Sequence, residues 1–256
     1  MDDMTIAGTL DVTELAFLAF TLFFIALIFY LRREDRREGY PVEDEVTGRV
    51  DTPGGPLSDG GPKEFLMPFD RGTVSTPTKG REKVDVAGKR TFRSPGAPYY
   101  PTGNPLEDGI GPASWADRAK HTDLDAEGHN RIVPIGTVPS ISIHKKDADP
   151  RGMTVLGADG KEAGTVSDIW IDRAEHQIRY LEIDTGSKKV LAPMAMSLVK
   201  GKKGMVIIDA LNAEDFAAAP VPAKAGEITF YEEERVVAYF GGGYLYANRE
   251  RQEPFV

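Results

Sequence analysis

The sequence predicts a single N-terminal transmembrane α-helix followed by a mainly-β cytoplasmic domain, a small antiparallel barrel with a short C-terminal helix. Three observations predict this fold class. A long uncharged apolar run lies near the N-terminus, short strand patterns recur after residue 132 with polar turns between them, and a helix-capping pattern occurs near residue 229. A chain of 256 residues is long enough for both parts.

The apolar run covers residues 15–31 without a charged side chain, and starting it at Val12 gives twenty residues with one carboxylate, Glu14. Twenty helical residues span about 30 Å, the thickness of a bilayer's hydrocarbon core. A signal peptide has basic residues before its apolar run, whereas here acidic residues precede the run and arginines follow it: Asp2, Asp3, Asp11 and Glu14, then Arg32, Arg33, Arg36 and Arg37. The positive-inside rule therefore predicts a periplasmic N-terminus and a cytoplasmic C-terminal part.

The predicted span contains no His, Asn, Gln or Lys, so it offers no imidazole to a metal or chlorin and no proton relay. Ala16, Ala19 and Ala26 fall near one face of the helix. These small residues would allow close packing against a partner helix. Alternatively, they reflect only the common occurrence of alanine in membrane spans.

Residues 41–112 hold eleven prolines and twelve glycines, a density typical of low-complexity chain. Eight large apolar residues favour an extended segment on a partner's surface, with a flexible tether as the alternative: Phe65, Leu66, Met67, Phe69, Phe92, Tyr99, Tyr100 and Leu106. We expect Gly39 and Pro41 to end the membrane helix. The predicted organisation is a periplasmic tail (1–11), the transmembrane helix with its cytoplasmic extension (12–36), the extended segment (37–115) and the barrel domain (116–256).

Short strands are predicted at residues 153–156, 164–172, 178–183, 190–192, 197–199 and 205–208. Ile169 and Ile171 lie on one face of the second of these. Several short strands without a long helix between them are typical of a small antiparallel barrel. Asn212 is expected to cap a helical turn before Pro220. Thr229-x-x-Glu232 predicts a helix that ends at Phe240, before the glycines 241–243.

Charge and motifs exclude several functions. The chain has 31 basic and 40 acidic residues, a net charge of −9, which disfavours nucleic acid as a partner. The absence of cysteine excludes disulfides, thiolate metal sites and a cysteine nucleophile. No phosphate loop, nucleophile elbow or zinc-binding helix motif occurs, and the four histidines lack metal-ligand spacing. The chain is therefore not expected to be an enzyme or to bind a metal or other cofactor itself.

Two groups of titratable residues remain, one at residues 123–129 and one at residues 172–179. Proton transfer needs groups with pKa values near the working pH, within reach of one another or of a bridging water. Carboxylates next to histidines meet this need, because histidine titrates near neutrality. Judged by spacing alone, solvated acidic loops are the more ordinary interpretation.

The sequence resembles one family over nearly its whole length. The resemblance rests on LRREDRREGYP (31–41) after a single span, PTGNPLEDGIGPASWADR (101–118), DPRGMTV (149–155), AGTVSDIWIDRAEHQIRYLE (163–182) and YFGGGYLYA (239–247). These motifs are similar to those of the H subunit of the photosynthetic reaction centre of purple bacteria, whose cytoplasmic part is a PRC-barrel domain.

The resemblance implies a structural and proton-conducting subunit in the bacterial inner, intracytoplasmic membrane. It would cap the L and M subunits, which carry bacteriochlorophyll, bacteriopheophytin, quinones and the non-haem iron, and it would bind none of these itself. It would also help protons to reach the secondary quinone. Membrane lipids, a cytochrome subunit and a light-harvesting antenna are further candidate partners.

Carried over by position, Asp125, Glu127 and His129 would form a proton-uptake cluster at the surface. Glu127 stands where other members can carry a second histidine, which puts any metal affinity of this cluster in doubt.

In the second group, Asp172 and Glu175 would be relay carboxylates near the quinone pocket, with Arg179 as their charge partner. His176 is adjacent, and its role is left open. Two alternatives stay open. One is a membrane-tethered barrel that acts as a scaffold or assembly factor without proton transfer. The other is an RNA-processing adaptor, since such barrels also resemble a ribosome-maturation module, and the acidic charge and the span disfavour it.

Overall fold

The computed structural model describes residues 5–7, 10–37, 44, 46–49, 60–76, 86–248 and 251. Two compact units make up the chain, Met1–Asp85 with Arg90–Pro98, and Val86–Lys89 with Tyr99–Val256. Asp2, Asp3, Gly39 and Pro41, to which the sequence analysis assigned roles at the ends of the membrane helix, lie outside the described residues.

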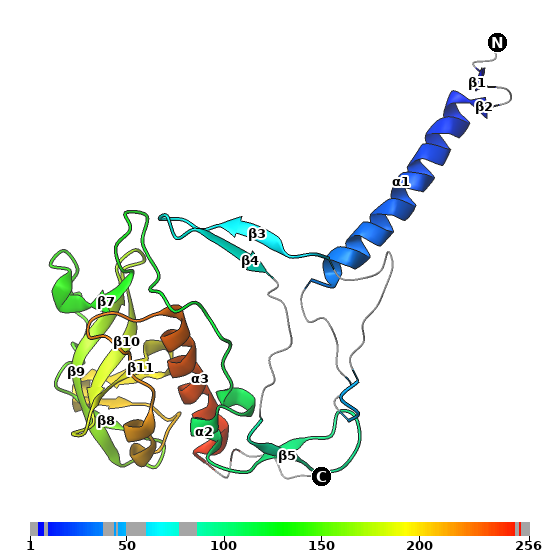
Figure 1. Ribbon diagram of the computed structural model, residues 1–256. Coiled ribbons are helices and arrows are strands. Elements are labelled where there is room, and N and C mark those ends of the chain that lie inside the picture. Colours follow the sequence, from blue (N-terminus) through cyan, green and yellow to red (C-terminus); the bar gives the residue numbers. More distant parts are fainter. Residues whose placement is uncertain are drawn as a thin grey trace. The chain divides into compact units, whose positions relative to one another are not determined.

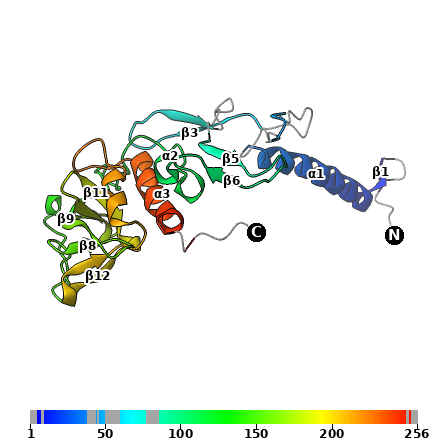
Figure 2. The same cartoon turned by 90° about the horizontal axis from the view of Figure 1, so that it is seen from below.

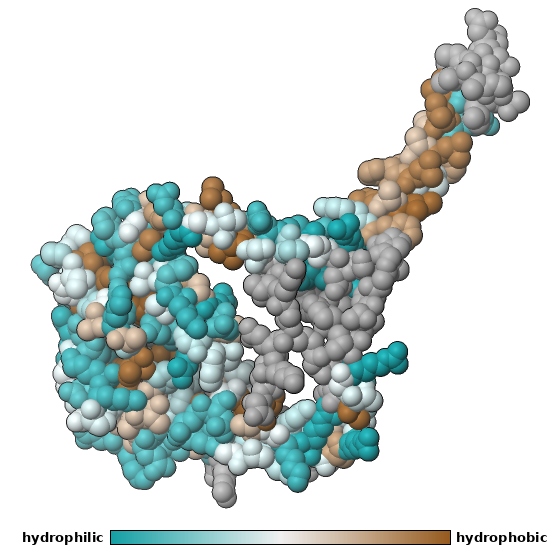
Figure 3. All heavy atoms as spheres, in the orientation of Figure 1, coloured by the Kyte–Doolittle hydropathy of each residue, from teal (hydrophilic) through white to brown (hydrophobic). Residues whose placement is uncertain are grey.

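The first unit contains the predicted membrane helix, α1, over Val12–Asp35. It follows the short strands β1 (Thr5–Ala7) and β2 (Leu10–Asp11). Asp11 Oδ1 accepts a hydrogen bond from the Glu14 backbone N–H at 2.8 Å, so the acidic residues before the span cap its N-terminus. No residue of α1 is buried, and hydrophobic side chains cover its surface (Figure 3). The sequence prediction of one long apolar helix is confirmed.

A β-hairpin in the same unit is tied to the end of α1. Strands β3 (Lys63–Leu66) and β4 (Thr73–Thr76) pair antiparallel. The Lys63 ammonium lies 2.6 Å from Glu34 Oε2, and the Arg37 guanidinium donates two hydrogen bonds to the same carboxylate, at 2.7 and 2.8 Å. The hairpin therefore begins at the cytoplasmic end predicted for α1.

The second unit is built on one sheet with the strand order β11-β10-β9-β8-β13-β12, and β7 also pairs with β9 (Figure 1). The strands are β7 (Ile132–Pro134), β8 (Thr154–Leu156), β9 (Glu162–Asp172), β10 (Gln177–Asp184), β11 (Lys189–Pro193), β12 (Leu198–Lys200) and β13 (Met205–Ile207). All six predicted strands are present.

One pair departs from the expected antiparallel arrangement, because β8 and β13 run parallel. The chain passes from β11 to β12 through a single 3₁₀ turn, η4 (Met194–Met196), and not through a hairpin. This connection does not reverse the chain direction, so the hairpin β12–β13 brings β13 alongside β8 in the same direction. The mainly-β class is unchanged.

The core lies between this sheet and the helical elements that cover it. Ile169 and Ile171, which the sequence analysis placed on one face of this strand, are both buried. Trp170, which points to the other side of β9, is also buried, since neighbouring elements cover both sides of this strand. Its indole N–H donates to Glu182 Oε2 at 3.1 Å, which satisfies its polar atom.

Short helical elements complete the unit: α2 (Pro105–Asp108), η2 (Gly111–Ala113), η3 (Ile135–Thr137), η5 (Gly201–Lys203) and η6 (Ala213–Ala218). Strands β5 (Gly88–Arg90) and β6 (Tyr99–Pro101) form a separate pair. The expected turn after Asn212 is confirmed as η6. Its capping interaction is a hydrogen bond from the Asn212 N–H to Asp215 Oδ2 at 3.1 Å.

Helix α3 (Phe230–Tyr246) packs against η2, α2 and β11 (Figures 1 and 2). Its N-terminal capping box is confirmed, with the Glu232 N–H donating to Thr229 Oγ1 at 3.2 Å. The predicted end at Phe240 is wrong, because the helix continues through the glycines. A Cβ at Gly242 would overlap Ala113, and one at Gly243 would overlap the Ala210 carbonyl. Gly242 and Gly243 thus allow close packing, which offsets their helix cost of about 1 kcal/mol each.

Candidate functional site

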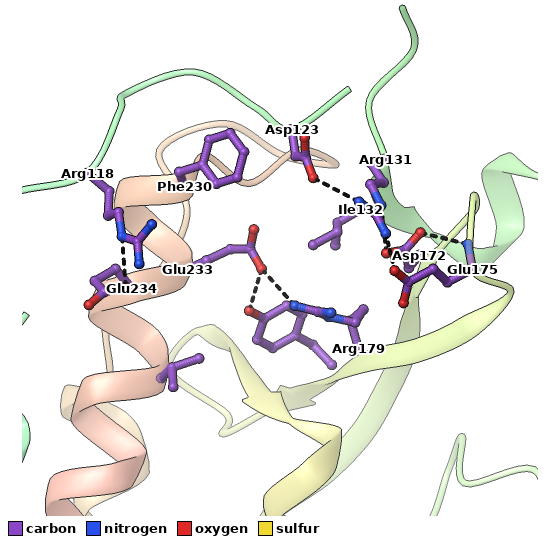
Figure 4. Close-up of a pocket in the computed structure, with 12 residues that line it drawn as sticks. Arg118, Asp123, Arg131, Ile132, Asp172, Glu175, Arg179, Phe230, Glu233 and Glu234 are labelled. Atoms are coloured by element: carbon purple, nitrogen blue, oxygen red, sulfur yellow. Dashed lines mark hydrogen bonds and ion pairs between the residues drawn. The ribbon is translucent and has the colours of Figure 1, made fainter. Parts of the chain in front are cut away.

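A polar pocket of about 360 Å³ lies between α3, the ends of β7 and β9, and the start of β10 (Figure 4). Five carboxylates and three arginines line it together with aromatic and aliphatic side chains. The lining residues are Arg118, Asp123, Arg131, Ile132, Asp172, Glu175, Arg179, Tyr180, Phe230, Glu233, Glu234 and Val237. Three of the six predicted site residues, Asp172, Glu175 and Arg179, therefore share one pocket.

Strand pairing explains why residues distant in sequence meet here. In the β7–β9 register Ile132 lies opposite Asp172, and the Arg173 N–H donates to the Arg131 carbonyl at 2.9 Å. The chain then turns through residues 173–176 into β10, and His176 takes a left-handed backbone conformation with φ 54°. This turn presents Glu175 beside Arg131.

Arg131 is the centre of the cluster. Its Nε lies 2.8 Å from Asp172 Oδ2 and its Nη1 lies 3.4 Å from Asp123 Oδ2, while Nη2 is paired with Glu175. These contacts raise the pKa of Arg131, with the Asp172 hydrogen bond as the largest cause. Arg131 is thus a permanent positive charge shared by three carboxylates (Figure 4).

Asp172 is the one fully buried charged residue in the described part of the chain, with 1% of its surface exposed. Its Oδ1 accepts the backbone N–H groups of Ala174 and Glu175, both at 3.0 Å. Burial acts to raise the pKa of Asp172, but Arg131 and these two N–H groups outweigh it and lower the pKa. Asp172 is therefore held ionised, and its carboxylate also closes the β9–β10 turn.

The structure assigns the charge partner of these carboxylates differently from the sequence analysis, which expected Arg179. Arg179 Nη2 lies 3.7 Å from Glu233 Oε2, and Arg131 occupies the position beside Asp172 and Glu175. The reason is the β7–β9 pairing, a tertiary contact that local spacing does not reveal.

Glu233, on the first turn of α3, is a pocket carboxylate that the sequence analysis missed. Its side chain is 14% exposed, and Glu233 Oε2 accepts a hydrogen bond from the Tyr180 hydroxyl at 2.8 Å. Burial raises the pKa of Glu233, and the charges of Asp123 and Asp172 add to this. The pKa stays raised although Tyr180 and Arg179 act against it. Burial likewise raises the pKa of Tyr180, so its phenol remains a neutral donor.

One signal in the sequence points to Glu233. Three consecutive glutamates open a predicted helix at residues 232–234, and the capping box accounts for only Glu232. Successive helix positions face different directions, so the side chain of Glu233 faces a different side of the helix from that of the capping residue Glu232.

The proposed proton-uptake residues lie on a loop beside this pocket. Asp125 Oδ1 accepts the N–H groups of Glu127 at 3.1 Å and His129 at 2.8 Å, and Oδ2 lies 3.3 Å from Arg173 Nε. The hydrogen bond from the His129 N–H is the largest cause of a lowered Asp125 pKa. Glu127 and His129 are exposed. Since Arg173 follows Asp172 directly, the two predicted clusters are neighbours in the structure.

His176, unlike its neighbours Asp172 and Glu175, does not line the Asp172 pocket. It lines a separate pocket of about 510 Å³ together with residues such as Ile143 and His144. Among the residues that the structure describes, no group of three His, Asp or Glu side chains is arranged to hold a metal ion.

Comparison with known protein families gives two matches that together cover most of the chain. Residues 4–137 match the model of the photosynthetic reaction centre H-chain N-terminal region, and this match covers more than half of the chain. The chain belongs to the family of reaction centre H chains. Residues 142–215 match the PRC-barrel domain, in agreement with the sheet of the second unit. As an H chain it is a structural subunit that associates with the reaction centre core, and α1 is its membrane anchor.

Proposed function

We propose that this H chain caps the cytoplasmic side of the L and M subunits and delivers protons to the secondary quinone that they bind. In this proposal the N-terminus is periplasmic and the domains after Arg32 are cytoplasmic, as the arginines that follow the span favour. The bacteriochlorophylls, bacteriopheophytins, quinones and non-haem iron belong to the partner subunits. Residues 37–115 would lie along the partner surface, and residues 116–256 would form the cap.

The observation that carries the proton-transfer proposal is that two groups of titratable side chains are neighbours in the second unit. Exposed His129 and Glu127 sit on the loop closed by Asp125, and Arg173 links this loop to the turn that holds Asp172 and Glu175. Protons pass between such groups directly or through one water.

The pKa directions divide the roles within this series. Asp125 and Asp172 have lowered pKa values, so they stay ionised and raise the local proton concentration by attraction. Glu233 has a raised pKa, which brings it closer to the working pH and suits it to bind and release a proton. Glu175 is 48% exposed at the rim, where water reaches its carboxylate. The positive charge of Arg179 acts to lower the pKa of Glu233.

The test uses the assembled reaction centre and measures the first and the second flash-induced electron transfers to the secondary quinone. Only the second is coupled to proton uptake in this proposal. Glu175→Gln combined with Glu233→Gln is expected to slow the second transfer by about tenfold. This is less than the about 10²–10⁴ of an irreplaceable acid–base group, because parallel carboxylates remain. The first transfer should be unchanged.

Glu162→Gln is the matched control, because Glu162 is an exposed glutamate on β9 that does not line the pocket. It should leave both rates as they are. Unaltered second-transfer kinetics in the double variant would contradict proton delivery through this pocket. The alternative function, a scaffold without proton transfer, would then stand, and the use of Asp125 and Asp172 to close turns is the observation that favours it.

A further inference from the structure

Arg235 of α3 lacks an acidic partner within the described ranges of the chain, although the domain around it is rich in carboxylates. Its guanidinium carbon lies 4.9 Å from the centre of the Trp115 ring and 5.8 Å from that of Tyr231. The Arg235 Nε is buried and has no hydrogen-bond acceptor among those residues. A buried charged donor without an acceptor costs free energy, so an acceptor supplied from outside would be stabilising.

Arg235 lines a cavity of about 120 Å³, separate from the Asp172 pocket and sharing no lining residue with it. This volume corresponds to about four water molecules at about 30 Å³ each. Leu106 and Pro220 give it apolar walls. Two of its other polar groups are engaged, since Tyr239 donates to the Asp215 carbonyl at 2.9 Å and Glu107 accepts from Asn104 Nδ2 at 2.7 Å. Arg235 is the one positively charged residue among those that line the cavity.

The geometry around Arg235 is preorganised. Trp115 packs directly on Gly109, where a Cβ would overlap the indole ring. Gly109 also takes φ 66° after α2, which favours glycine at this position. The fixed ring holds the guanidinium by cation–π contact, so little side-chain freedom is lost when a ligand binds.

The charge around the cavity selects the class of ligand. The guanidinium fork matches a carboxylate through two parallel hydrogen bonds. Glu107 lines the same cavity, and its negative charge disfavours a doubly charged phosphate more than a singly charged carboxylate. We propose that this cavity binds one carboxylate group, held by Arg235 against Trp115.

The test titrates the full-length chain in detergent with acetate and follows the two tryptophan indole N–H signals by NMR. Trp115 reports on the cavity, and Trp170 is an internal control because it is bound to Glu182 in the sheet. Acetate should shift the Trp115 signal saturably and leave the Trp170 signal in place. Arg235→Met, which keeps the aliphatic stem, should abolish the shift. Arg235→Lys, which keeps the charge without the fork, should weaken binding about tenfold.

Two results would overturn the proposal: an acetate shift that persists in Arg235→Met, or phosphate binding as tight as acetate at equal ionic strength. A Trp170 signal in its wild-type position shows that each variant is folded. Repeating the titration in the assembled reaction centre distinguishes the sources of the carboxylate. Saturable acetate binding that disappears on assembly indicates an acidic side chain or chain end of a partner subunit, and binding that persists indicates a free small molecule.

Discussion

Replacing Arg131 with methionine should destabilise the second unit far more than the loss of an ordinary ion pair. Methionine keeps a similar length and removes the charge shared by Asp172, Asp123 and Glu175. Removing one partner of a buried pair costs about 3–5 kcal/mol, because the other charge is left buried. The pairs with Asp123 and Glu175 are partly exposed, and each adds only about 0–1 kcal/mol. We therefore expect a loss of about 3–7 kcal/mol at pH 7.

The effect should depend on pH in a defined direction. The folded-state pKa of Asp172 is lowered, so its stabilisation is present above the unfolded value of about 3.9 and is lost as the pH falls through the folded value. Without Arg131, burial dominates and Asp172 binds a proton more readily. The difference between wild type and Arg131→Met should therefore shrink as the pH falls toward 4.

Urea denaturation of the full-length chain in detergent, followed by tryptophan fluorescence, measures both effects. Arg151→Met is the matched control, since Arg151 is paired with Asp149 at 2.6 Å but both side chains are more than 40% exposed. It should cost less than about 1 kcal/mol. Adding Asp172→Asn to Arg131→Met should restore part of the loss by removing the uncompensated charge. Equal losses in Arg131→Met and Arg151→Met, or no recovery in the double variant, would refute this reasoning.

Two further predictions concern α3. The raised pKa of Glu233 means that wild-type stability should fall as the pH rises through the titration of this group, because its folded form favours the proton. Glu233→Gln should remove that slope in denaturation curves measured between pH 5 and 8, and an unchanged slope would contradict the assignment. Gly243→Ala should destabilise the chain by about 1–3 kcal/mol through overlap with the Ala210 carbonyl. Gly241→Ala meets only the Pro112 carbonyl at 3.9 Å, so it should gain up to about 1 kcal/mol, and equal effects would show that packing does not explain the glycines.

Elements governed by local patterns were predictable from the sequence. The α1 helix follows from the composition of residues 15–31, and the capping box at Thr229 follows from a four-residue spacing. The end of α3 was not predictable, because glycines 241–243 read equally as a helix stop and as a close-packing surface. Only the positions of Ala113 and Ala210 decide between these.

The candidate site shows the same limit. Asp172, Glu175 and Arg179 belong to one local motif, and the structure places them in one pocket. Arg131 directly precedes β7, and Glu233 lies on α3. They join the site through strand register and helix packing, which one sequence does not encode in any local spacing.

The hydrogen bonds of the carboxylates also decide for which of them a substitution gives an interpretable functional result. Asp125 and Asp172 each accept two backbone N–H groups, so replacing either disrupts a turn as well as a charge. Within the described residues, the carboxylates of Glu175 and Glu233 accept hydrogen bonds from side chains alone, Arg131 and Tyr180 respectively. A kinetic change in Asp172→Asn is therefore ambiguous, whereas one in the Glu175 and Glu233 variants with unchanged stability reports on proton transfer itself.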